Sequence, residues 1–372
     1  MRRLWAGVAA VGILLVWAPA AHADDVRDAE WMVEALRLPE AHRIATGEGV
    51  TVGIVDTGVD STHPDLTGVV VAGKDSWSPA GDGQTDVTGH GTAMASLVAG
   101  HGHGDGGGDG VLGVAPGARI LSYGAWRPGD EKYDDAELLK GIRWVIDNGA
   151  DVILLAYGGG TGEPEEEALI DEAEAKGIPV VAPTANALAG EKHVGFPGLF
   201  TNVVLAGCSG KDGDYSEVGL EHPAIAVAAP CEGLTSAGPD GGYEDTSGTS
   251  KAAATTAGTL ALLKSHWPDM SREDMMRQLY STADDKQEAG RDRKVGYGVI
   301  NPLTALTSPV RPYDPSNPPH VNGDPVYQSD PPATSSLAPP ADSQPPWALI
   351  GIVGAAVVGG LVLLVVLSRR RA

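Results

Sequence analysis

The sequence predicts an α/β domain built on a mostly parallel sheet with helices on both faces. Short apolar runs rich in valine, isoleucine and leucine recur between residues 49 and 308, and segments with helical spacing of apolar residues separate them. Strands that are apolar along their whole length are typical of a parallel sheet covered on both faces. A stretch of about 260 residues is within the range of one such domain.

Strands and helices alternate along this stretch. Short apolar runs next to turn residues predict strands at residues 50–55, 119–123, 151–156, 179–182, 203–206 and 225–228. Apolar residues at helical spacing, such as Leu138, Ile142 and Val145, predict helices at residues 90–99, 134–148, 164–176, 249–265 and 271–282. Functional groups of this architecture gather at the carboxyl ends of strands and at the helix starts that follow them.

The first 23 residues have the pattern of a secretory signal peptide. Arg2 and Arg3 precede an apolar run over residues 4–18, and Ala21 and Ala23 form a small-x-small cleavage site. The alternative is an N-terminal membrane anchor, for which the run is short. We therefore expect the mature chain to begin at Asp24 with an N-terminal extension over residues 24–48.

The C-terminal end predicts a single transmembrane helix at residues 347–367. These 21 residues carry no charge, and such a run crosses a hydrocarbon layer of about 30 Å. Arginines at 369–371 belong on the cytoplasmic side and disfavour the alternative of a GPI-type signal. Residues 309–346, rich in proline and serine, predict a linker. We expect an extracellular domain of residues 49–308, one membrane span and a cytoplasmic tail of residues 368–372.

The charge balance excludes nucleic acid as a partner. The chain has 26 basic and 49 acidic residues, a net charge of −23. Setting aside the five arginines at the two ends leaves 21 basic residues, so the exported part carries −28. Nucleic-acid binding needs a basic surface, which this chain lacks. Two cysteines also exclude a disulfide-rich scaffold and a cysteine-rich zinc module.

Three short motifs place an acid, a histidine and a serine where such a domain gathers its functional groups. Asp56 ends an apolar strand, His90 begins a helix, and Ser250 stands at the start of another helix. Each alone has an ordinary explanation as a turn residue or a helix cap. Together they supply a nucleophile, a base for its proton and a carboxylate that orients the base. The helix start at Ser250 adds backbone N–H groups near a developing oxyanion.

The order Asp, His, Ser on an α/β frame resembles the subtilase family of serine proteases. The resemblance covers residues 49–305 and implies that Asp56, His90 and Ser250 form a catalytic triad. It also implies that Asn186 donates a hydrogen bond from its side chain to the oxyanion. By the same resemblance, the substrate cleft is lined by Leu155, Ala156, Tyr157 and Gly158.

The arrangement of signal peptide, protease body, proline-rich tract and C-terminal span resembles the mycosins, membrane-anchored subtilases of actinobacterial type VII secretion. This implies an endopeptidase that cleaves exported proteins at the outer face of the cell membrane, with a secretion complex as partner. A second expectation is a structural scaffold of such a complex with little or no protease activity. A third, an esterase, is disfavoured because the chain lacks a Gly-x-Ser-x-Gly elbow.

Several residues near the motifs differ from those usual in the family. Lys251 follows the nucleophile where an apolar residue is common, Ala254 replaces a proline, and Ala156 replaces a serine at the cleft. Ala185 replaces a glycine before Asn186; an alanine forced to positive φ costs about 1 kcal/mol. A displacement of about 1 Å at a catalytic group costs about a hundredfold in rate. We therefore expect a slow or narrowly specific protease.

Two further features concern cross-links and metals. Cys208 and Cys231 follow successive strands, and an exported chain favours a disulfide between them over two free thiols. Some subtilases hold calcium at the stretch matching residues 101–109 together with an acid matching Asp65. The oxygen ligands here are sparse, so we expect a flexible surface loop and no metal or other required cofactor. The acidic helix at residues 163–174 predicts a solvated face, with a subsite for basic substrate residues as the alternative.

Overall fold

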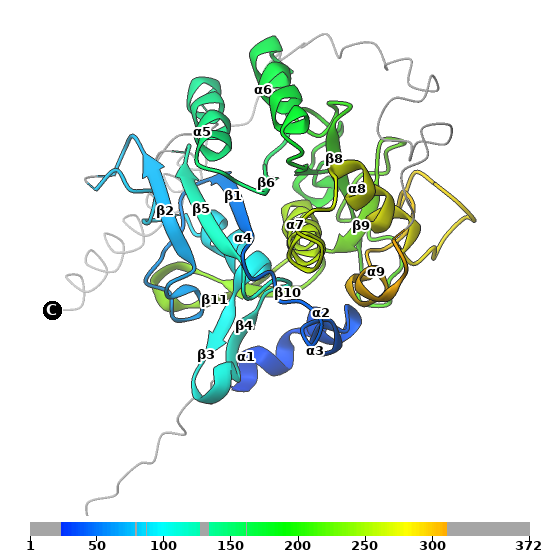
Figure 1. Ribbon diagram of the computed structural model, residues 1–372, viewed down its shortest axis with the longest axis horizontal. Helices are drawn as coiled ribbons and strands as arrows, with labels where there is room; N and C mark the ends of the chain where they lie inside the picture. Colours follow the sequence, from blue (N-terminus) through cyan, green and yellow to red (C-terminus); the bar gives the residue numbers. More distant parts are fainter. Residues whose placement is uncertain (1–23, 79, 87, 127–133, 161, 311–372) are drawn as a thin grey trace, which may run out of the picture. The chain divides into compact units, whose positions relative to one another are not determined.

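A computed structural model describes residues 24–310, apart from 79, 87, 127–133 and 161 (Figure 1). A seven-stranded sheet lies at its centre in the order β2-β5-β1-β6-β7-β8-β9, and every neighbouring pair of strands is parallel. The strands are β1 (Thr51–Asp56), β2 (Val70–Asp75), β5 (Arg119–Gly124), β6 (Val152–Leu154), β7 (Val180–Pro183), β8 (Val203–Ser209) and β9 (Val227–Pro230). The α/β architecture with a parallel sheet is therefore confirmed.

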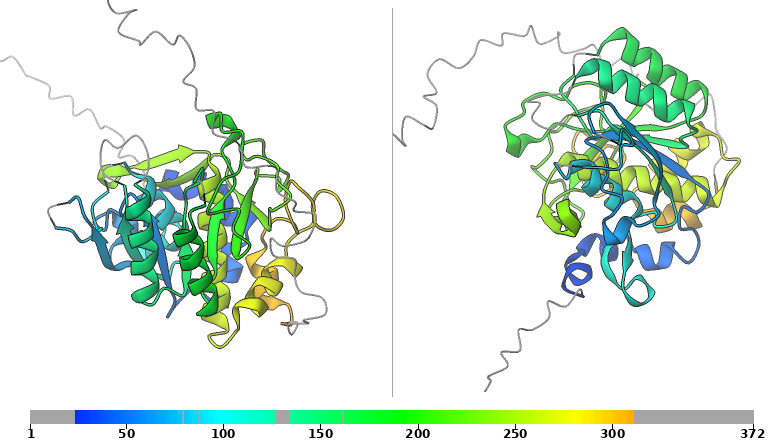
Figure 2. Two further views of the ribbon diagram at one scale, coloured as in Figure 1. Left: turned by 90° about the horizontal axis from the view of Figure 1, so that it is seen from above. Right: turned by 90° about the vertical axis from the view of Figure 1, so that its left-hand side faces the viewer.

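Helices cover both faces of the sheet (Figure 2). α5 (Asp135–Asp147) and α6 (Pro164–Ala175) pack on one face, and α4 (His90–Ala99) and α7 (Thr249–His266) pack on the other. Because side chains alternate along a strand, Ile54 joins the core under α4 and α7, whereas Val55 joins the core under α5 and α6. Gly53 lets α5 approach closely, since a Cβ there would lie 2.7 Å from the Cβ of Val145.

Smaller elements surround this body. They comprise two hairpins, the two helices that follow α7 and four 3₁₀ turns. They are β3 (His101–His103) with β4 (Asp109–Leu112), β10 (Leu234–Ala237) with β11 (Tyr243–Thr246), α8 (Arg272–Ser281), α9 (Pro302–Thr307), η1 (Pro64–Leu66), η2 (Asp105–Gly107), η3 (Ala187–Ala189) and η4 (Pro239–Gly241). The stretch 101–109 forms the β3–β4 hairpin rather than the flexible loop we expected.

The N-terminal extension folds onto the domain as three short helices: α1 (Asp24–Ala29), α2 (Trp31–Ala35) and α3 (Leu38–Ala41). Met32 and Leu38 are fully buried in the core under α4 and α7. The indole Nε1 of Trp31 donates to the carbonyl oxygens of Glu232 and Gly233, at 3.1 and 3.0 Å. These contacts make residues 24–48 part of the packed body.

The predicted signal peptide at 1–23, almost all of the predicted linker and the predicted span at 347–367 lie outside the described residues. In the part of the chain that the structure describes, no helix combines the length and the apolar character needed to cross a membrane. A disulfide joins Cys208 of β8 to Cys231, which directly follows β9. It links the ends of two adjacent parallel strands.

Candidate active site

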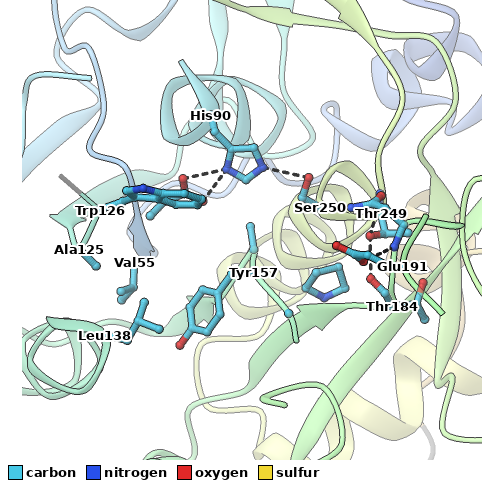
Figure 3. Close-up of a pocket in the computed structure, with 15 residues that line it drawn as sticks. Val55, His90, Ala125, Trp126, Leu138, Tyr157, Thr184, Glu191, Thr249 and Ser250 are labelled. Atoms are coloured by element: carbon cyan, nitrogen blue, oxygen red, sulfur yellow. Dashed lines mark hydrogen bonds and ion pairs between the residues drawn. The ribbon is translucent and has the colours of Figure 1, made fainter. Parts of the chain in front are cut away.

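The three triad candidates meet at the carboxyl edge of the sheet. Figure 3 shows the imidazole of His90 facing Ser250. Asp56 ends β1, His90 is the first residue of α4, and Ser250 is the second residue of α7. His90 Nδ1 lies 2.8 and 2.9 Å from the two carboxylate oxygens of Asp56, and its Nε2 lies 3.1 Å from Ser250 Oγ. Because an ionised carboxylate only accepts, Nδ1 carries the proton and Nε2 accepts from the Ser250 hydroxyl.

The start of α4 packs directly against the turn that follows β1. A Cβ at Gly91 would collide with the carbonyl oxygen of Gly58, so only glycine allows this approach. The backbone N–H of Gly91 also donates to Thr57 Oγ1 at 2.9 Å. Asp56 and His90 therefore come from two elements that are held together by the backbone itself.

Asp86 anchors the same junction and was not singled out from the sequence. One of its carboxylate oxygens accepts from Thr57 Oγ1 at 3.0 Å and from the backbone N–H of Gly89 at 2.9 Å. The other accepts from the backbone N–H and the hydroxyl of Thr92, at 2.9 and 2.7 Å. Asp86 is 9% exposed. The carboxylate thus fastens the residues on both sides of His90 to the residue that follows Asp56.

Charges around His90 favour its protonated form. Partial withdrawal from water lowers the pKa of His90, but the negative charge of Asp56 and its hydrogen bond raise it more. The charge of Asp86 raises this pKa further, and the charge of Lys251 lowers it. The net result is a pKa above the ordinary value of 6.5. The imidazolium that forms during acyl transfer is therefore stabilised by its surroundings.

Asn186 is oriented to donate into the cleft. Its Oδ1 accepts from the backbone N–H of Thr249 at 2.8 Å and from Thr249 Oγ1 at 3.1 Å. Because a backbone N–H can only donate, this contact identifies the oxygen of the amide and leaves Nδ2 as the remaining donor. Nδ2 forms no hydrogen bond within the part of the chain that the structure describes.

The strain that we expected at Ala185 is absent. Positive φ outside glycine occurs at Arg37 and Asp240 among the described residues, so Ala185 needs no such conformation. Its carbonyl oxygen accepts from the N–H of Leu220 at 3.1 Å. The expected displacement of Asn186 therefore has no basis in the backbone.

Two hollows flank Ser250, and both include His90, Asn186 and Ser250 itself. The first is lined in addition by Val55, Asp56, Ala125, Trp126, Leu138, Ala156, Tyr157, Gly158, Pro183, Thr184, Glu191 and Thr249. The second is lined in addition by Thr88, Ala93, Met94, Leu188, Ala189, Val218, Glu244, Thr246, Ser247, Gly248 and Lys251. An extended peptide passing Ser250 would contact both.

Of the four residues assigned to the cleft, Ala156, Tyr157 and Gly158 line the first hollow. Leu155 lies beneath it, fully buried in the core under α5 and α6, because strand alternation turns it away from Ala156. Leu155 supports the cleft rather than lining it.

The acidic helix α6 is not wholly a solvated face. The hydroxyl of Tyr157 donates to Glu166 Oε1 at 3.3 Å, and Glu166 is 9% exposed. Burial raises the pKa of Glu166 to about 7. Glu165 and Glu167 are exposed, as expected for the rest of the helix.

The residues at the stretch that suggested calcium do not fit that ion. Asp65 is fully buried, and its carboxylate accepts from His103 Nδ1 at 2.6 Å and from the N–H of Val111 at 2.8 Å. The guanidinium of Arg27 donates to the carbonyl oxygens of Gly110 and Gly107, at 2.9 and 3.2 Å. Oxygen atoms that already face N–H donors and a fixed cation do not form a calcium cage. Across the described residues, no three His, Cys, Asp or Glu side chains cluster as metal ligands.

A serine, a base bonded to it, a carboxylate that orients the base and a free amide donor define a serine hydrolase site. The chain belongs to the subtilase family, whose model (peptidase S8) matches residues 47–298. It is 34% identical to subtilisin DY of Bacillus licheniformis over 261 residues, which is 68% of this chain and 90% of that protein. The resemblance to subtilases is therefore confirmed, and the chain is a subtilisin-like serine protease.

Solved structures narrow the relationship. One is the serine protease MycP1, described as an essential component of the type VII (ESX-1) secretion system. It matches with a TM-score of 0.65 and 29% identity, covering 78% of this chain and 91% of that one. Another is the MycP3 protease from the type VII (ESX-3) secretion system, with a TM-score of 0.67, 27% identity and coverages of 78% and 90%. The similarity to mycosins is thus confirmed.

Proposed function

We propose that the protein is a membrane-anchored extracellular endopeptidase that uses Ser250, His90 and Asp56 to hydrolyse peptide bonds of exported proteins. The observation that carries this proposal is the 3.1 Å contact between His90 Nε2 and Ser250 Oγ, with Nδ1 held by Asp56. A serine hydroxyl becomes a useful nucleophile near neutral pH only beside such a base. The hollows on both sides of Ser250 suit an extended peptide substrate.

The geometry assigns each group a step. Ser250 Oγ attacks the scissile carbonyl carbon while its proton passes to His90 Nε2, and Asp56 remains ionised and stabilises the imidazolium. The oxyanion accepts from Asn186 Nδ2 and from the backbone N–H of Ser250, a first-turn donor without an intrahelical acceptor. His90 then donates its proton to the leaving amine. A water molecule, deprotonated by His90, releases the acyl group and restores Ser250.

The proposed site of action is supported by the patterns at the two ends of the chain and by the relatives. MycP1 and MycP3 are described as belonging to type VII secretion systems. The predicted signal peptide and the predicted span at 347–367 support an extracellular protease held at the cell membrane. We accordingly propose exported proteins as substrates and a type VII secretion complex as partner.

We further propose slow or narrowly specific proteolysis. Backbone strain at Ala185 does not support this proposal, because Ala185 has no positive φ. The support comes from Lys251, which places a buried amine directly after the nucleophile. A turnover of casein equal to that of a digestive subtilisin would contradict this.

A scaffold with little protease activity is the second candidate. It is favoured by the likeness to MycP1, described as an essential component of a secretion system. The two candidates differ in the chemistry of Ser250.

Labelling with a fluorophosphonate separates them. The full-length protein, purified in detergent, should react covalently with the probe, and the Ser250→Ala variant should not. Absence of labelling on a folded wild-type protein would reject the protease and leave the scaffold. If Ser250→Ala also sustains secretion by cells that lack the native protein, the scaffold role exists beside the protease.

A further inference from the structure

Two buried charges outside the triad flank the catalytic imidazole. Asp86 lies on the Asp56 side, as described above. Lys251 lies on the Ser250 side and is 4% exposed; its Nζ donates to the carbonyl oxygen of Leu234 at 2.6 Å and to Ser236 Oγ at 3.0 Å. Within the described residues it forms no ion pair closer than 4.0 Å. A buried ammonium without a carboxylate partner is costly, which calls for a functional reason.

Lys251 connects the helix of the nucleophile to the helix of the base. Its two hydrogen bonds end on β10. The same strand is bonded to α4, because the N–H of Ala237 donates to Ser96 Oγ at 3.0 Å. His90 is the first residue of α4 and Ser96 the seventh, so Lys251 links the start of α7 through β10 to the helix that carries His90. Asp86 fixes the start of α4 to the end of β1 from the other side.

The two residues also act on the imidazole through their opposite charges. His90 is faced by Asp56 from β1, by Asp86 from the preceding segment and by Lys251 from α7, while Glu244 of β11 lines the same hollow. Asp86 raises the pKa of His90 and Lys251 lowers it. Burial lowers the pKa of Lys251 to about 8, against the charges of Glu244 and Asp245, so Lys251 is still charged at neutral pH.

We propose that Asp86 and Lys251 are opposed positioning residues of the protease: together they hold His90 between Asp56 and Ser250, Asp86 through the start of α4 and Lys251 through β10. If they do, removal of either charge should change the pH dependence of catalysis, and the two changes should have opposite sign. The proposal rests on the proteolytic function proposed above. It assigns a purpose to the lysine that replaces the usual apolar residue after the nucleophile. It also assigns a purpose to Asp86, which lies four residues before His90.

The test compares the acid limb of kcat/KM on a fluorogenic peptide for the full-length protein and its charge variants. Asp86→Asn should move the midpoint to lower pH, because loss of a negative charge favours neutral His90. Lys251→Met, of similar length but uncharged, should move it to higher pH. The two shifts should have opposite sign, and each should exceed the scatter of repeated measurements of the wild-type midpoint. The double variant should return towards the wild-type midpoint.

Matched controls separate charge from structure. Lys251→Arg keeps the charge and should keep the wild-type midpoint, even where kcat falls. Lys264→Met removes the same charge 13 residues further along α7, about 20 Å away, and should shift nothing. Asp82→Asn removes a half-buried carboxylate of the same segment that bonds Gln84 instead of the triad, and should also shift nothing. Melting temperatures verify that each variant folds.

A second readout does not depend on proteolysis. In the Ser250→Ala background, NMR titration of His90 reports its protonation directly, and the same opposite shifts are expected there. Equal midpoints in all variants, or shifts in one direction, would overturn the proposal. If Asp86→Asn does not fold, Lys251→Met against Lys251→Arg decides alone. If the NMR titrations show the expected opposite shifts but the protein cleaves no peptide, the proposed proteolytic function is rejected. The roles of Asp86 and Lys251 in setting the protonation of His90 are then retained.

Discussion

Among the described residues, two histidines place Nδ1 less than 3 Å from a buried carboxylate, and only one of them meets a nucleophile. His90 Nδ1 lies 2.8 Å from Asp56, and His103 Nδ1 lies 2.6 Å from Asp65. Both carboxylates are buried, and the two imidazoles are 42% and 33% exposed. His90 presents Nε2 to Ser250 at 3.1 Å, whereas Nε2 of His103 has no partner among the residues described.

The difference shows that a carboxylate-oriented histidine is not in itself catalytic. Asp65 also accepts from the N–H of Val111 and thereby closes the β3–β4 hairpin onto η1. The hydrogen bonds of the Asp65–His103 pair therefore join the β3–β4 hairpin to η1. At the cleft the joining is done by Asp86, which leaves the Asp56–His90 pair free to serve Ser250. The following predictions test this division, from the largest effect to the smallest.

The largest expected effect is on activity, and it should be confined to the Asp56–His90 pair that contacts the nucleophile. Ser250→Ala should lower kcat/KM on the order of a million-fold, because the hydroxyl is the attacking group. Its melting temperature should change little. His103→Gln should leave kcat/KM near the wild-type value and lower the melting temperature. Peptide hydrolysis and thermal unfolding of both variants measure this contrast, and an activity loss in His103→Gln would contradict it.

The same substitution at the two acids should have opposite consequences. Asp56→Asn should lower kcat on the order of ten-thousandfold, because the amide favours the wrong imidazole tautomer. Asp65→Asn should instead lower the free energy of unfolding by about 1–3 kcal/mol, because a buried acceptor of two N–H groups is weakened. Urea unfolding and kinetics on both proteins give the result. A large kinetic defect in folded Asp65→Asn would show that the hairpin reaches the cleft.

Asn186 should matter to the rate alone. Asn186→Ala removes the Nδ2 donor and should lower kcat by about 10²–10³-fold, with a smaller change in KM. Asn186→Asp keeps the oxygen that accepts from Thr249 but places a negative charge at the oxyanion, and should lower kcat at least as far. Retention of kcat in Asn186→Asp would mean that the amide only supports the start of α7.

The smallest expected effect is on the pH dependence of kcat/KM, which reports the protonation of His90. Its raised pKa places the acid limb of kcat/KM at a midpoint above pH 6.5, because only the neutral imidazole accepts the Ser250 proton. The same shift stabilises the fold below pH 6.5, and this contribution is lost as the pH rises through the folded-state pKa. Rates between pH 5 and 9 measure the limb. A midpoint at or below 6.5 would contradict the charge arrangement around His90.

The parts of the fold that the sequence predicts well are those buried on both faces. The helix expected at residues 90–99 is α4, and the strand expected at 50–55 is β1 shifted by one residue. β2 was missed because it is an edge strand whose Val71 is 47% exposed, so it carries no continuous apolar run. β11 was missed because its residues are mostly polar and half-buried or exposed.

The candidate site divides in the same way. Asn186 is implied by the family resemblance alone. Asp56, His90 and Ser250 are recognisable because their chemistry depends on residue type and on the element that each one begins or ends. Asp86 and Lys251 are not, because their roles lie in contacts such as Thr57 with Asp86 and Leu234 with Lys251, which no local pattern records. Leu155 was assigned to the cleft by the family resemblance, which does not show that its side chain points into the core under α5 and α6.

The contacts of the first helix limit how far downstream of Asp24 the leader can be cleaved without loss of hydrogen bonds. α1 begins at Asp24, where we expect the leader to be removed, and Arg27 lies three residues further on. A peptidase that cut four residues late would delete the guanidinium that serves the carbonyls of Gly107 and Gly110. Cleavage one helical turn too late would thus remove hydrogen bonds from a hairpin that lies at least 80 residues away along the chain.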